Sequence, residues 1–367
     1  MRIFQKKIIY FLSCCAFFCF FQIINASIEV SNTQEIKKNL SIMQAIKKAF
    51  KTDEIERSQP LLGGFSSPGV YKIFIKGVPY VLRLSHPNRK RIDQQRSITC
   101  MTLSSERGLS PKIYYANPED GIIITDFIRS SPSLDIEISQ ETLNKLALKI
   151  RELHDGPHFP EFLSVFEVRR KFEQSIKNIN PHMINIISKE LKKIETILSK
   201  DMIKRPTHND LKSENILFDG RIFWFIDWEA ASEGDPFFDL TTIIIFYNLN
   251  AQQENLFLKS YFGRAPTQSQ KLRVYLMKQV VMAYYGTAYL MVSKIHHIKP
   301  LLKEEIEKLP MLETYMKNKI SNKQNLHTYQ ELQVLGWILL KEVFKNLTSK
   351  EFKKICEKQC SAETFKK

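Results

Sequence analysis

The sequence predicts an α+β fold with two lobes, a small antiparallel sheet followed by a larger helical lobe. Short runs of β-branched and aromatic residues, separated by glycine-containing turns, lie between residues 60 and 128. From Phe237 onward, apolar residues recur at helical spacing almost to the end of the chain. A chain of 367 residues, 43% hydrophobic and 25% charged, has the composition of a globular protein with a sizeable core.

The first 26 residues form a segment of a different kind. Arg2, Lys6 and Lys7 precede a long apolar run that ends near Ala26. That order is typical of a secretory signal peptide, and the run of about 17 apolar residues is also long enough for a membrane anchor. We therefore expect residues 1–26 to export the chain or to associate it with a membrane. A cytoplasmic location is the alternative, if translation starts later.

The expected elements of the smaller lobe follow this segment. Residues 31–51 predict an amphipathic helix, whose apolar face is formed by Ile36, Leu40, Met43, Ile46 and Phe50. A polar helix is expected from residue 88 to residue 107, where Gly108 ends it. The expected strands, in two pairs before and after that polar helix, are residues 70–75, 80–84, 112–116 and 121–128.

The larger lobe is expected to begin after Ser130, where the pattern changes to helical spacing. Residues 142–154 and 183–199 are predicted to be helices. Two short strands on either side of an Asp219-Gly220 turn interrupt the helical pattern. The strands form a hairpin in the densest polar stretch of the chain.

The net charge of +15 raises the question of a nucleic-acid partner. The lysines are spread along polar helix faces, no basic run is interleaved with aromatic residues, and no zinc-finger spacing is present. We therefore expect no nucleic-acid partner. Three of the six cysteines lie in the N-terminal apolar segment, and the other three have no spacing typical of a disulfide framework or a metal site.

The polar stretch from Thr207 to Glu229 carries the chemistry. Asp210 and Asn215 lie on a loop five residues apart, and the hairpin returns Asp227 to the side of that loop. Two carboxylates and an amide oxygen around one point suit Mg²⁺, which needs few protein ligands when it is shared with phosphates. The spacing therefore predicts a site for phosphoryl transfer.

Phosphoryl transfer assigns a task to each group of this stretch. One carboxylate orients the acceptor hydroxyl and takes its proton, while the amide and the second carboxylate hold the metal. Lys212 is placed to reach the transferring phosphate, and His208 to brace the backbone of the loop. Each residue alone also has an ordinary explanation, with His208 bonded to backbone and Lys212 solvated.

The stretch resembles the aminoglycoside phosphotransferase and choline kinase superfamily, which is related to the protein kinases. The resemblance rests on HNDLKSENIL, on IDWE and on EGDPFFDL, with weaker matches in the right order at VLRL, GLSPKIYYAN, IIITDFI and Leu153-His154. It covers about residues 40 to 340. Within the superfamily the chain is most similar to bacterial choline, ethanolamine or thiamine kinases.

The resemblance implies a protein-kinase-like two-lobed fold that uses ATP and Mg²⁺. It implies an N-terminal helix with a nucleotide-binding lobe at residues 27–128, and a helical lobe with the catalytic loop and the substrate site at residues 129–367. Asp210 would be the catalytic base, and Asn215 and Asp227 would hold Mg²⁺. The implied nucleotide-binding residues are Gly64 and Gly69 in a loop over the phosphates, Arg83 towards the α- and β-phosphates, and the backbone of Asp126, Phe127 and Ile128 at the adenine.

Two further acids are placed by the same resemblance. Glu229 would contact metal-bound water or substrate, and Asp239 would be the buried acid that anchors the catalytic loop. One feature departs from the family pattern, because no acid lies between Gln94 and Thr102, where related kinases carry a Glu that pairs with the strand cation. We therefore expect Arg83 to lack its usual partner.

The expected function is an ATP- and Mg²⁺-dependent transfer of the γ-phosphate to the hydroxyl of a small molecule, most plausibly choline, ethanolamine or a similar amino alcohol. Tyr284, Tyr285, Tyr289 and Trp337 could line a site for a quaternary ammonium group, or they could be core residues. After Asp239 the chain has no Asp, and its ten Glu face twenty Lys and Arg, which disfavours a polycationic aminoglycoside.

Two alternatives remain open. An exported chain meets no ATP unless it is delivered into another cell, so an inactive secreted binding or effector module on a kinase scaffold is the first alternative. A protein kinase is disfavoured, because the sequence has neither an Asp-Phe-Gly nor an Ala-Pro-Glu motif. The sequence leaves the oligomeric state open.

Overall fold

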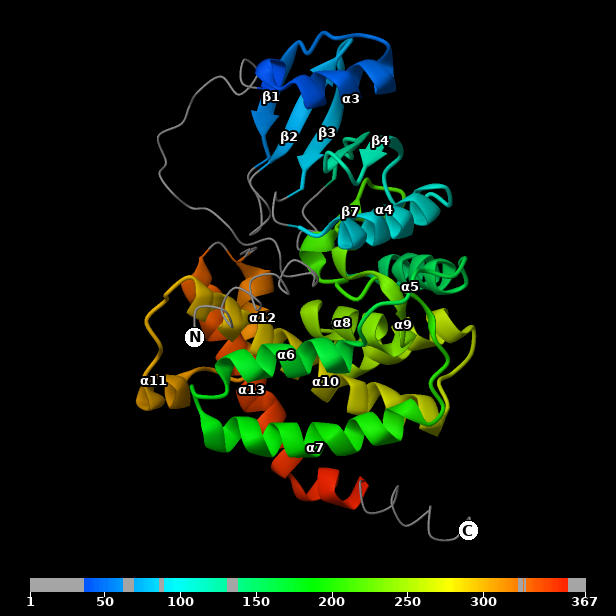
Figure 1. Cartoon of the computed structure of the whole chain (residues 1–367). Coiled ribbons are helices and arrows are strands. Elements are labelled where there is room, and N and C mark those ends of the chain that lie inside the picture. Colours follow the sequence, from blue (N-terminus) through cyan, green and yellow to red (C-terminus); the bar gives the residue numbers. More distant parts are fainter. Residues whose placement is uncertain are drawn as a thin grey trace. The chain divides into compact units, whose positions relative to one another are not determined.

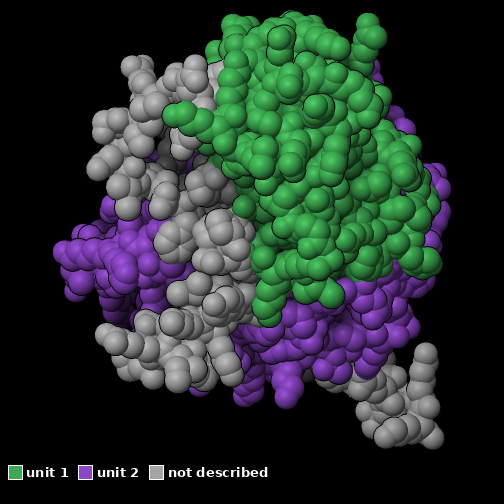
Figure 2. Space-filling model, turned by 45° about the horizontal axis from the view of Figure 1, so that its top comes forward, with its two compact units in different colours: residues 1–137, 155–160, 208–232 green, residues 138–154, 161–207, 233–367 purple. Residues whose placement is uncertain are grey.

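The computed structural model describes residues 36–61, 69–85, 89–130, 138–322, 326 and 328–355. The chain packs into two compact units (Figure 2). One unit contains residues 1–137, 155–160 and 208–232, and the other contains residues 138–154, 161–207 and 233–367. These units interleave along the sequence, whereas the expected lobes meet at a single boundary after residue 128, which stays a prediction. Gly64 and the N-terminal segment 1–26 lie outside the described residues.

The first unit is built on a five-stranded antiparallel sheet with the strand order β1-β2-β3-β5-β4 (Figure 1). This confirms the small antiparallel sheet that the sequence predicts. The strands are β1 (Arg57–Pro60), β2 (Val70–Ile75), β3 (Val78–Leu84), β4 (Ile113–Asn117) and β5 (Ile122–Asp126). Strand β1 was not predicted, because its four residues are polar or proline and lie mostly exposed at the edge of the sheet.

The N-terminal helix α3 (Leu40–Phe50) covers the sheet core. Asn39 caps it by accepting a hydrogen bond from the backbone of Ile42 at 3.2 Å. The helix thus begins after Asn39, and its buried residues are Ile42, Ala45 and Ile46. The predicted apolar face was therefore wrong at Leu40, which is 72% exposed.

Helix α4 (Arg91–Ser105) buries polar side chains. Asp93, Gln94, Arg96 and Ser97 are each less than 9% exposed. Buried polar groups need hydrogen-bond partners, so a helix with such a face marks a polar site within the unit. The helix contacts η3 (Trp228–Ala230), which follows Asp227.

The hairpin of the first unit consists of β7 (Ile216–Phe218) and β8 (Phe223–Phe225), paired in antiparallel register. The short helix η2 (Ser213–Asn215) precedes it. The predicted hairpin is present, but four residues, 219–222, join its strands, so the turn is longer than the Asp219-Gly220 pair alone. Gly220 has a φ of 93°, which glycine adopts without strain.

The second unit is mostly helical, as the sequence predicts. Helix α10 lies at its centre and contacts α6, α7, α8 and α13, while α5 packs against α9. Strands β6 (Arg205–Thr207) and β9 (Ser232–Gly234) form a separate pair. The helices are α5 (Gln140–His154), α6 (Val165–Ile176), α7 (Pro181–Ser199), α8 (Pro236–Phe246), α9 (Ala251–Phe262), α10 (Gln268–Ile295), α11 (Lys303–Lys308), α12 (Leu312–Ser321) and α13 (Tyr329–Thr348).

The aromatic residues of α10 and α13 belong to the core of this unit. Tyr284, Tyr285, Tyr289 and Trp337 are each no more than 3% exposed. Tyr284 packs edge-on against Phe238 of α8, with ring centroids 5.2 Å apart. Their burial supports the core interpretation of these four residues. None of the helices in the described ranges is long and apolar enough to span a membrane.

Gly69 is held where a side chain would collide. Its φ is 142°, and a Cβ atom there would lie 2.9 Å from the Cβ of Leu84. Leu84 also donates its backbone N–H to the Gly69 carbonyl at 2.8 Å, so the two residues cannot separate freely. We expect Gly69→Ala to destabilise the chain by about 2 kcal/mol.

The matched control for Gly69→Ala is Gly77→Ala. Gly77 also has a positive φ, of 74°, but a Cβ there meets no atom within 4 Å. An alanine at position 77 would carry the strain of a left-handed backbone, about 1 kcal/mol, without the collision. Urea unfolding should therefore rank Gly69→Ala as the less stable variant. Equal midpoints would show that the contact with Leu84 relaxes.

Candidate active site

The candidate catalytic loop begins after β6 and is tied to η3 and to the segment that follows it. Asn209 has a left-handed backbone, with a φ of 61°, which asparagine tolerates better than most residues. Its side-chain nitrogen donates to the carbonyl of Ala230 at 3.0 Å and to the hydroxyl of Ser232 at 3.1 Å. The loop is thereby fixed before it reaches Asp210.

His208 joins the same loop to the end of β8. Its Nε2 lies 2.9 Å from the carbonyl oxygen of Ile226, so that nitrogen carries the proton and donates it. The side chain is fully buried, and its ring centroid lies 4.6 Å from that of Trp228. The contact places His208 as a brace of the backbone and gives it no exposed surface towards a substrate.

Asp210 and Asn215 face each other across the loop. The Asn215 side-chain nitrogen donates to the Asp210 carbonyl oxygen at 2.8 Å and to its carboxylate at 2.7 Å. The Lys212 ammonium lies 3.3 Å from the same carboxylate. Because its nitrogen is engaged with Asp210, the Asn215 amide presents its oxygen on the other side.

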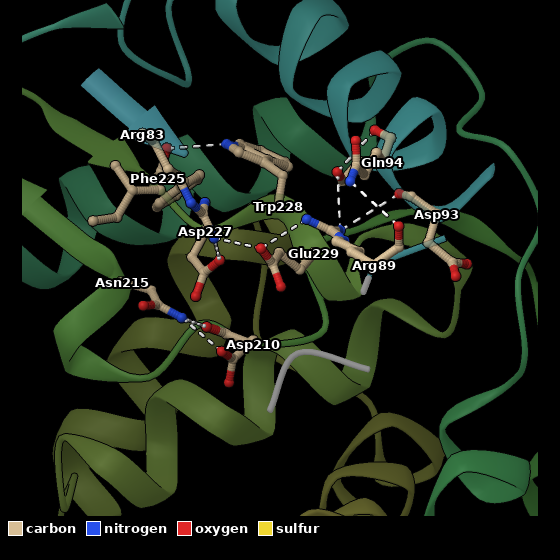
Figure 3. Close-up of polar contacts among 12 residues, drawn as sticks. Arg83, Arg89, Asp93, Gln94, Asp210, Asn215, Phe225, Asp227, Trp228 and Glu229 are labelled. Atoms are coloured by element: carbon tan, nitrogen blue, oxygen red, sulfur yellow. Dashed lines mark hydrogen bonds and ion pairs between the residues drawn. The ribbon is translucent and has the colours of Figure 1, made fainter. Parts of the chain in front are cut away.

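Asp227 is brought to this pair by the hairpin. The Ile226 backbone N–H donates to the Asn215 carbonyl oxygen at 3.0 Å, so the next residue lies beside the loop. Figure 3 shows the Asp227 carboxylate gathered with the Asp210 and Asn215 side chains. Asp227 has a left-handed backbone, with a φ of 68°. The structure thus brings together the three residues that the sequence singled out.

The charges around Asp227 favour its ionised form. Burial opposes ionisation of this carboxyl, but the positive charges of Arg83 and Lys212 outweigh that effect and hold its pKa below the ordinary value. The Arg83 guanidinium donates to the Asp227 carboxylate at 3.0 Å. Asp227 is therefore an anion, as a metal ligand must be.

The same residues fit Mg²⁺. An amide oxygen from Asn215 and a carboxylate from Asp227 are hard oxygen donors, the type that Mg²⁺ prefers. Within the described residues no cluster of three His, Cys, Asp or Glu side chains could hold a metal by itself. A two-residue donor set suits Mg²⁺ shared with substrate phosphates and does not suit a structural metal enclosed by protein.

Asp219 shapes the loop of the hairpin that carries Asp227. One carboxylate oxygen accepts the backbone N–H groups of Arg221 and Ile222, and the other accepts the indole N–H of Trp224 at 2.8 Å. Partial burial raises the pKa of Asp219, but these hydrogen bonds together lower it by a larger amount, so the net shift of the pKa is downward. Its ionised form is therefore favoured by folding.

A depressed pKa predicts an acid-dependent loss of stability. The contribution of Asp219 is present above its unfolded pKa of about 3.9 and is lost as the pH falls through its lower folded pKa. Asp219→Asn should be less stable than the wild-type chain at about pH 6, and the difference should shrink below about pH 4. Urea midpoints measured across that range check this. A difference that is constant with pH would contradict it.

Arg83 is paired with two acids, and neither of them lies in the polar helix where related kinases carry the glutamate. Its guanidinium donates to Asp227 and to Glu229, both from the segment after β8 (Figure 3). The expectation looked for the acid in the polar helix, whereas the acids come from a segment 144 and 146 residues further along the chain. The position of the Arg83 guanidinium is therefore fixed by the segment that carries Asp227 and Glu229.

Three residues expected to bind adenine through their backbone lie at the end of β5. The Asp126 backbone N–H donates to the Lys112 carbonyl oxygen at 2.9 Å. The Asp126 side chain is engaged with Tyr114, whose pKa is raised to about 12 by burial and by that hydrogen bond. The Lys72 ammonium lies over the Phe127 ring, 3.9 Å from the ring centroid. Ile128 follows beyond the strand.

Gly69 and Arg83 belong to the same sheet as these residues. Gly69 directly precedes β2, Arg83 lies near the end of β3, and β3 pairs with β5. In that register Arg83 faces Ile123, and Tyr80 faces Asp126. Arg83, expected to bind phosphate, and Asp126, expected to lie at the adenine, are therefore on two neighbouring strands of the sheet. The role of each residue towards a nucleotide stays a prediction.

The second unit holds Asp239, to which the family resemblance gave an anchoring role. Asp239 is fully buried in α8, and its carboxylate lies 3.1 Å from His154 Nε2. The other ring nitrogen of His154 lies 2.8 Å from the Tyr261 hydroxyl. These contacts tie α5, α8 and α9 together.

Sequence reasoning missed Arg89 and Arg96. Arg89 is buried and donates to Glu229 at 2.8 Å, and Arg96 donates to the Glu229 carbonyl oxygen at 2.6 Å. The signal in the sequence was two arginines, Arg89 just before the polar helix and Arg96 within it, in the region where an acid was expected. Both residues are directed at the segment that carries Asp227.

Comparison with known proteins identifies the family. Residues 58–270 match the model of the phosphotransferase enzyme family. The protein LicA of Haemophilus influenzae is 28% identical over 236 residues, which are 60% of this chain and 69% of that protein. A LicA homolog of Metamycoplasma hominis is 30% identical over 154 residues, 41% of this chain and 60% of that protein.

Solved structures share the fold. A choline/ethanolamine kinase family protein from Mesorhizobium loti has a TM-score of 0.60 at 17% identity, covering 89% of this chain and 97% of that chain. The choline kinase LicA from Streptococcus pneumoniae has a TM-score of 0.60 at 18% identity, covering 80% of this chain and 100% of that chain. At these identities the likeness concerns the fold, and it confirms the kinase-like two-lobed class. The matched residues are more than half of the chain and include the candidate catalytic loop, the hairpin and Arg83, and the chain therefore belongs to the phosphotransferase enzyme family.

Proposed function

We propose that the chain transfers the γ-phosphate of ATP, with Mg²⁺, to the hydroxyl of a small amino alcohol such as choline or ethanolamine. The observation that carries the proposal is the cluster of Asp210, Asn215 and Asp227 beside Arg83. A buried acid, a fixed amide oxygen and an ionised second acid next to a cation are the groups that phosphoryl transfer uses.

The residues would divide the work by their placement. Asp210 would accept the proton of the acceptor hydroxyl, and Lys212, 3.3 Å from it, would offer a positive charge to the transferring phosphate. Asn215 and Asp227 would hold Mg²⁺, whose charge neutralises the phosphates when it is bound. Arg83 would bind the remaining phosphate oxygens. His208 and Asn209 would keep the loop in place through their backbone partners.

The acceptor class is supported by the similar proteins and by charge. One structural neighbour is described as a choline kinase and another as a choline/ethanolamine kinase family protein. The chain after Asp239 contains ten Glu, no Asp and twenty Lys or Arg, a balance that suits an acceptor with one positive charge better than a polycation. The aromatic residues Tyr284, Tyr285, Tyr289 and Trp337 are buried core residues.

Release of ADP by the purified chain tests this function. Mg-ATP would be offered with choline, ethanolamine, thiamine, homoserine or an aminoglycoside, each in a separate reaction, with Asp227→Ala as control. Turnover on choline or ethanolamine that is lost in the control is the expected result. ATP binding without turnover on either amino alcohol would overturn the proposed acceptor class. Failure to bind Mg-ATP would overturn the kinase function itself.

An inactive binding module is the second candidate. Two observations motivate it, the export-like segment and the absence of an acid between Gln94 and Thr102 in the polar helix. The second observation carries less weight because Arg83 is paired with Asp227 and Glu229. Calorimetric titration with Mg-ATP separates the candidates, because an inactive module of this kind would release no binding heat.

The location of the chain is a further part of the proposal. We propose that residues 1–26 export the chain or anchor it, because a charged start precedes an apolar run in that segment. An exported kinase would need ATP where it is delivered, for example in another cell. N-terminal sequencing of the protein from its native source should find Ser27 as the first residue. A chain that starts near Met43 would contradict export.

A further inference from the structure

Arg83 and Arg89 share one carboxylate. The Glu229 Oε1 atom accepts hydrogen bonds from both guanidinium groups, from Arg89 at 2.8 Å and from Arg83 at shorter range. Glu229 is 6% exposed and Arg89 is 8% exposed, so this ion pair is shielded from water. Figure 3 shows Glu229 between the two arginines. Buried charges of this kind are stable only with their partners in place.

Arg89 is itself held by α4. Its second guanidinium nitrogen donates to the Ser97 hydroxyl at 3.1 Å, and its backbone carbonyl accepts from the Gln94 side chain at 3.4 Å. Ser97 in turn donates to the Gln94 carbonyl oxygen at 3.0 Å. Arg89 thus has a fixed direction, and it fixes the direction of the Glu229 carboxylate.

The arrangement reverses the charge pattern of a kinase with an acid in this helix. In protein kinases the strand cation is held by a glutamate of the neighbouring helix. Here the helix side contributes the cation Arg89, and the acid Glu229 comes from η3, two residues after Asp227. The order Arg83–Glu229–Arg89 therefore joins β3 to the segment just before α4 through an acid that belongs to neither.

The Arg83–Glu229–Arg89 network matters most when a metal ion engages Asp227. Arg83 has two anchors, Asp227 and Glu229. When Mg²⁺ and phosphates take up Asp227, as in the proposed function, Glu229 is the anchor that remains. A Glu229 without Arg89 would have to be neutralised by Arg83 alone, and this would draw the Arg83 guanidinium towards Glu229 and away from the phosphates.

From this geometry we infer that Arg89 is a positioning residue for nucleotide binding, acting through Glu229 on Arg83. The inference rests on the proposed use of Mg-ATP and adds to it the residue that replaces the missing helix acid. Arg89 does not touch the nucleotide in this account. Its side chain determines the position of the Arg83 guanidinium by way of Glu229.

Calorimetric titration of Arg89→Ala with Mg-ATP tests the inference. The expected result is affinity about ten-fold weaker than in the wild-type chain, with kcat at saturating ATP reduced much less. The matched control is Arg91→Ala, which removes a nearby arginine, the first residue of α4, that pairs with Glu119 at the surface. The Arg91 variant should bind as the wild type does. Unchanged affinity in Arg89→Ala would overturn the inference.

A double-mutant cycle with Glu229→Gln separates positioning from a general effect of charge and from folding. If Arg89 acts through Glu229, the double variant should bind Mg-ATP as weakly as Glu229→Gln alone. Its melting temperature should exceed that of either single variant, because removing both partners leaves no unpaired buried charge. Additive losses of affinity, or affinity that recovers together with stability, would overturn the inference.

Arg89→Lys keeps the charge but cannot donate in the same planar geometry to Glu229 and Ser97. We expect its affinity to lie between those of the wild type and Arg89→Ala, and full recovery would show that charge alone matters. Failure of the wild-type chain to bind Mg-ATP would instead overturn the proposed function. The stability part of the cycle would still report on the Arg89–Glu229 pair in that case, so the two failures are distinguishable.

Discussion

Asp210→Asn should lower kcat by about 10²- to 10⁴-fold, the usual contribution of a positioned general base. The amide has the size of the carboxylate and can still bond with Asn215, so the loop geometry should be kept. It cannot accept the proton of the acceptor hydroxyl. Because Asp210 is outside the proposed metal ligands, Mg-ATP affinity should change by less than about two-fold.

Steady-state rates and calorimetry on the same preparation check this prediction. Asp201→Asn is a suitable control, because Asp201 is an exposed acid that lies nine residues before Asp210 in the sequence. It should retain the wild-type rate. An Asp210→Asn enzyme with a near-normal kcat would remove Asp210 from the chemistry and leave it a structural role in the loop.

Asp227→Asn should have the second large effect, on the metal. Asparagine tolerates the left-handed backbone of this position, so the substitution removes charge while it keeps the fold. Two consequences follow from the lost charge. The Mg²⁺ concentration needed for half-maximal rate should rise, and kcat/KM should fall on the order of 10³-fold, which corresponds to several kcal/mol of lost transition-state stabilisation.

Magnesium titrations of the rate at saturating ATP measure the first consequence. The Asp227→Asn curve should shift to higher Mg²⁺, whereas the Asp210→Asn curve should keep its midpoint and reach a lower maximal rate. This contrast separates the metal ligand from the base. Identical magnesium midpoints in the wild-type and Asp227→Asn chains would contradict the role of Asp227 in metal binding.

The sheet and most helices follow from local patterns. Strands β2, β3, β4 and β5 are short runs rich in β-branched and aromatic residues, and turn residues separate them, which is typical of strands. Helix α6 was missed although its signal was present, since Ser164 and Glu167 form a capping box before an apolar stripe. Strand β1 has no such pattern, because an exposed edge strand needs no apolar face.

Leu40 shows the limit of periodicity. Ile36 and Leu40 fit one helical face by spacing, but the Asn39 cap starts a new helix between them and changes the register. Helix capping outweighs the continuation of a weak stripe here. The result is an exposed leucine beside a buried Ile42.

The active-site loop was predictable because its residues are close in sequence. Asp210, Asn215 and Asp227 lie within 18 residues, and a hairpin is enough to bring them together. The Arg83–Glu229–Arg89 network was not predictable, because its members are up to 146 residues apart and the family pattern places the acid in another element. Long-range pairing depends on packing, which local sequence patterns do not encode.

The central claim is transfer of phosphate from ATP to a small amino alcohol. Phosphorus NMR of the wild-type chain with Mg-ATP and choline, and with Mg-ATP and ethanolamine in a second sample, tests it directly. We expect a phosphomonoester of one acceptor to form in equal amount to ADP, and we expect none with Asp210→Asn. ADP accompanied by inorganic phosphate and no phosphomonoester, or ATP left intact with both acceptors, would contradict it.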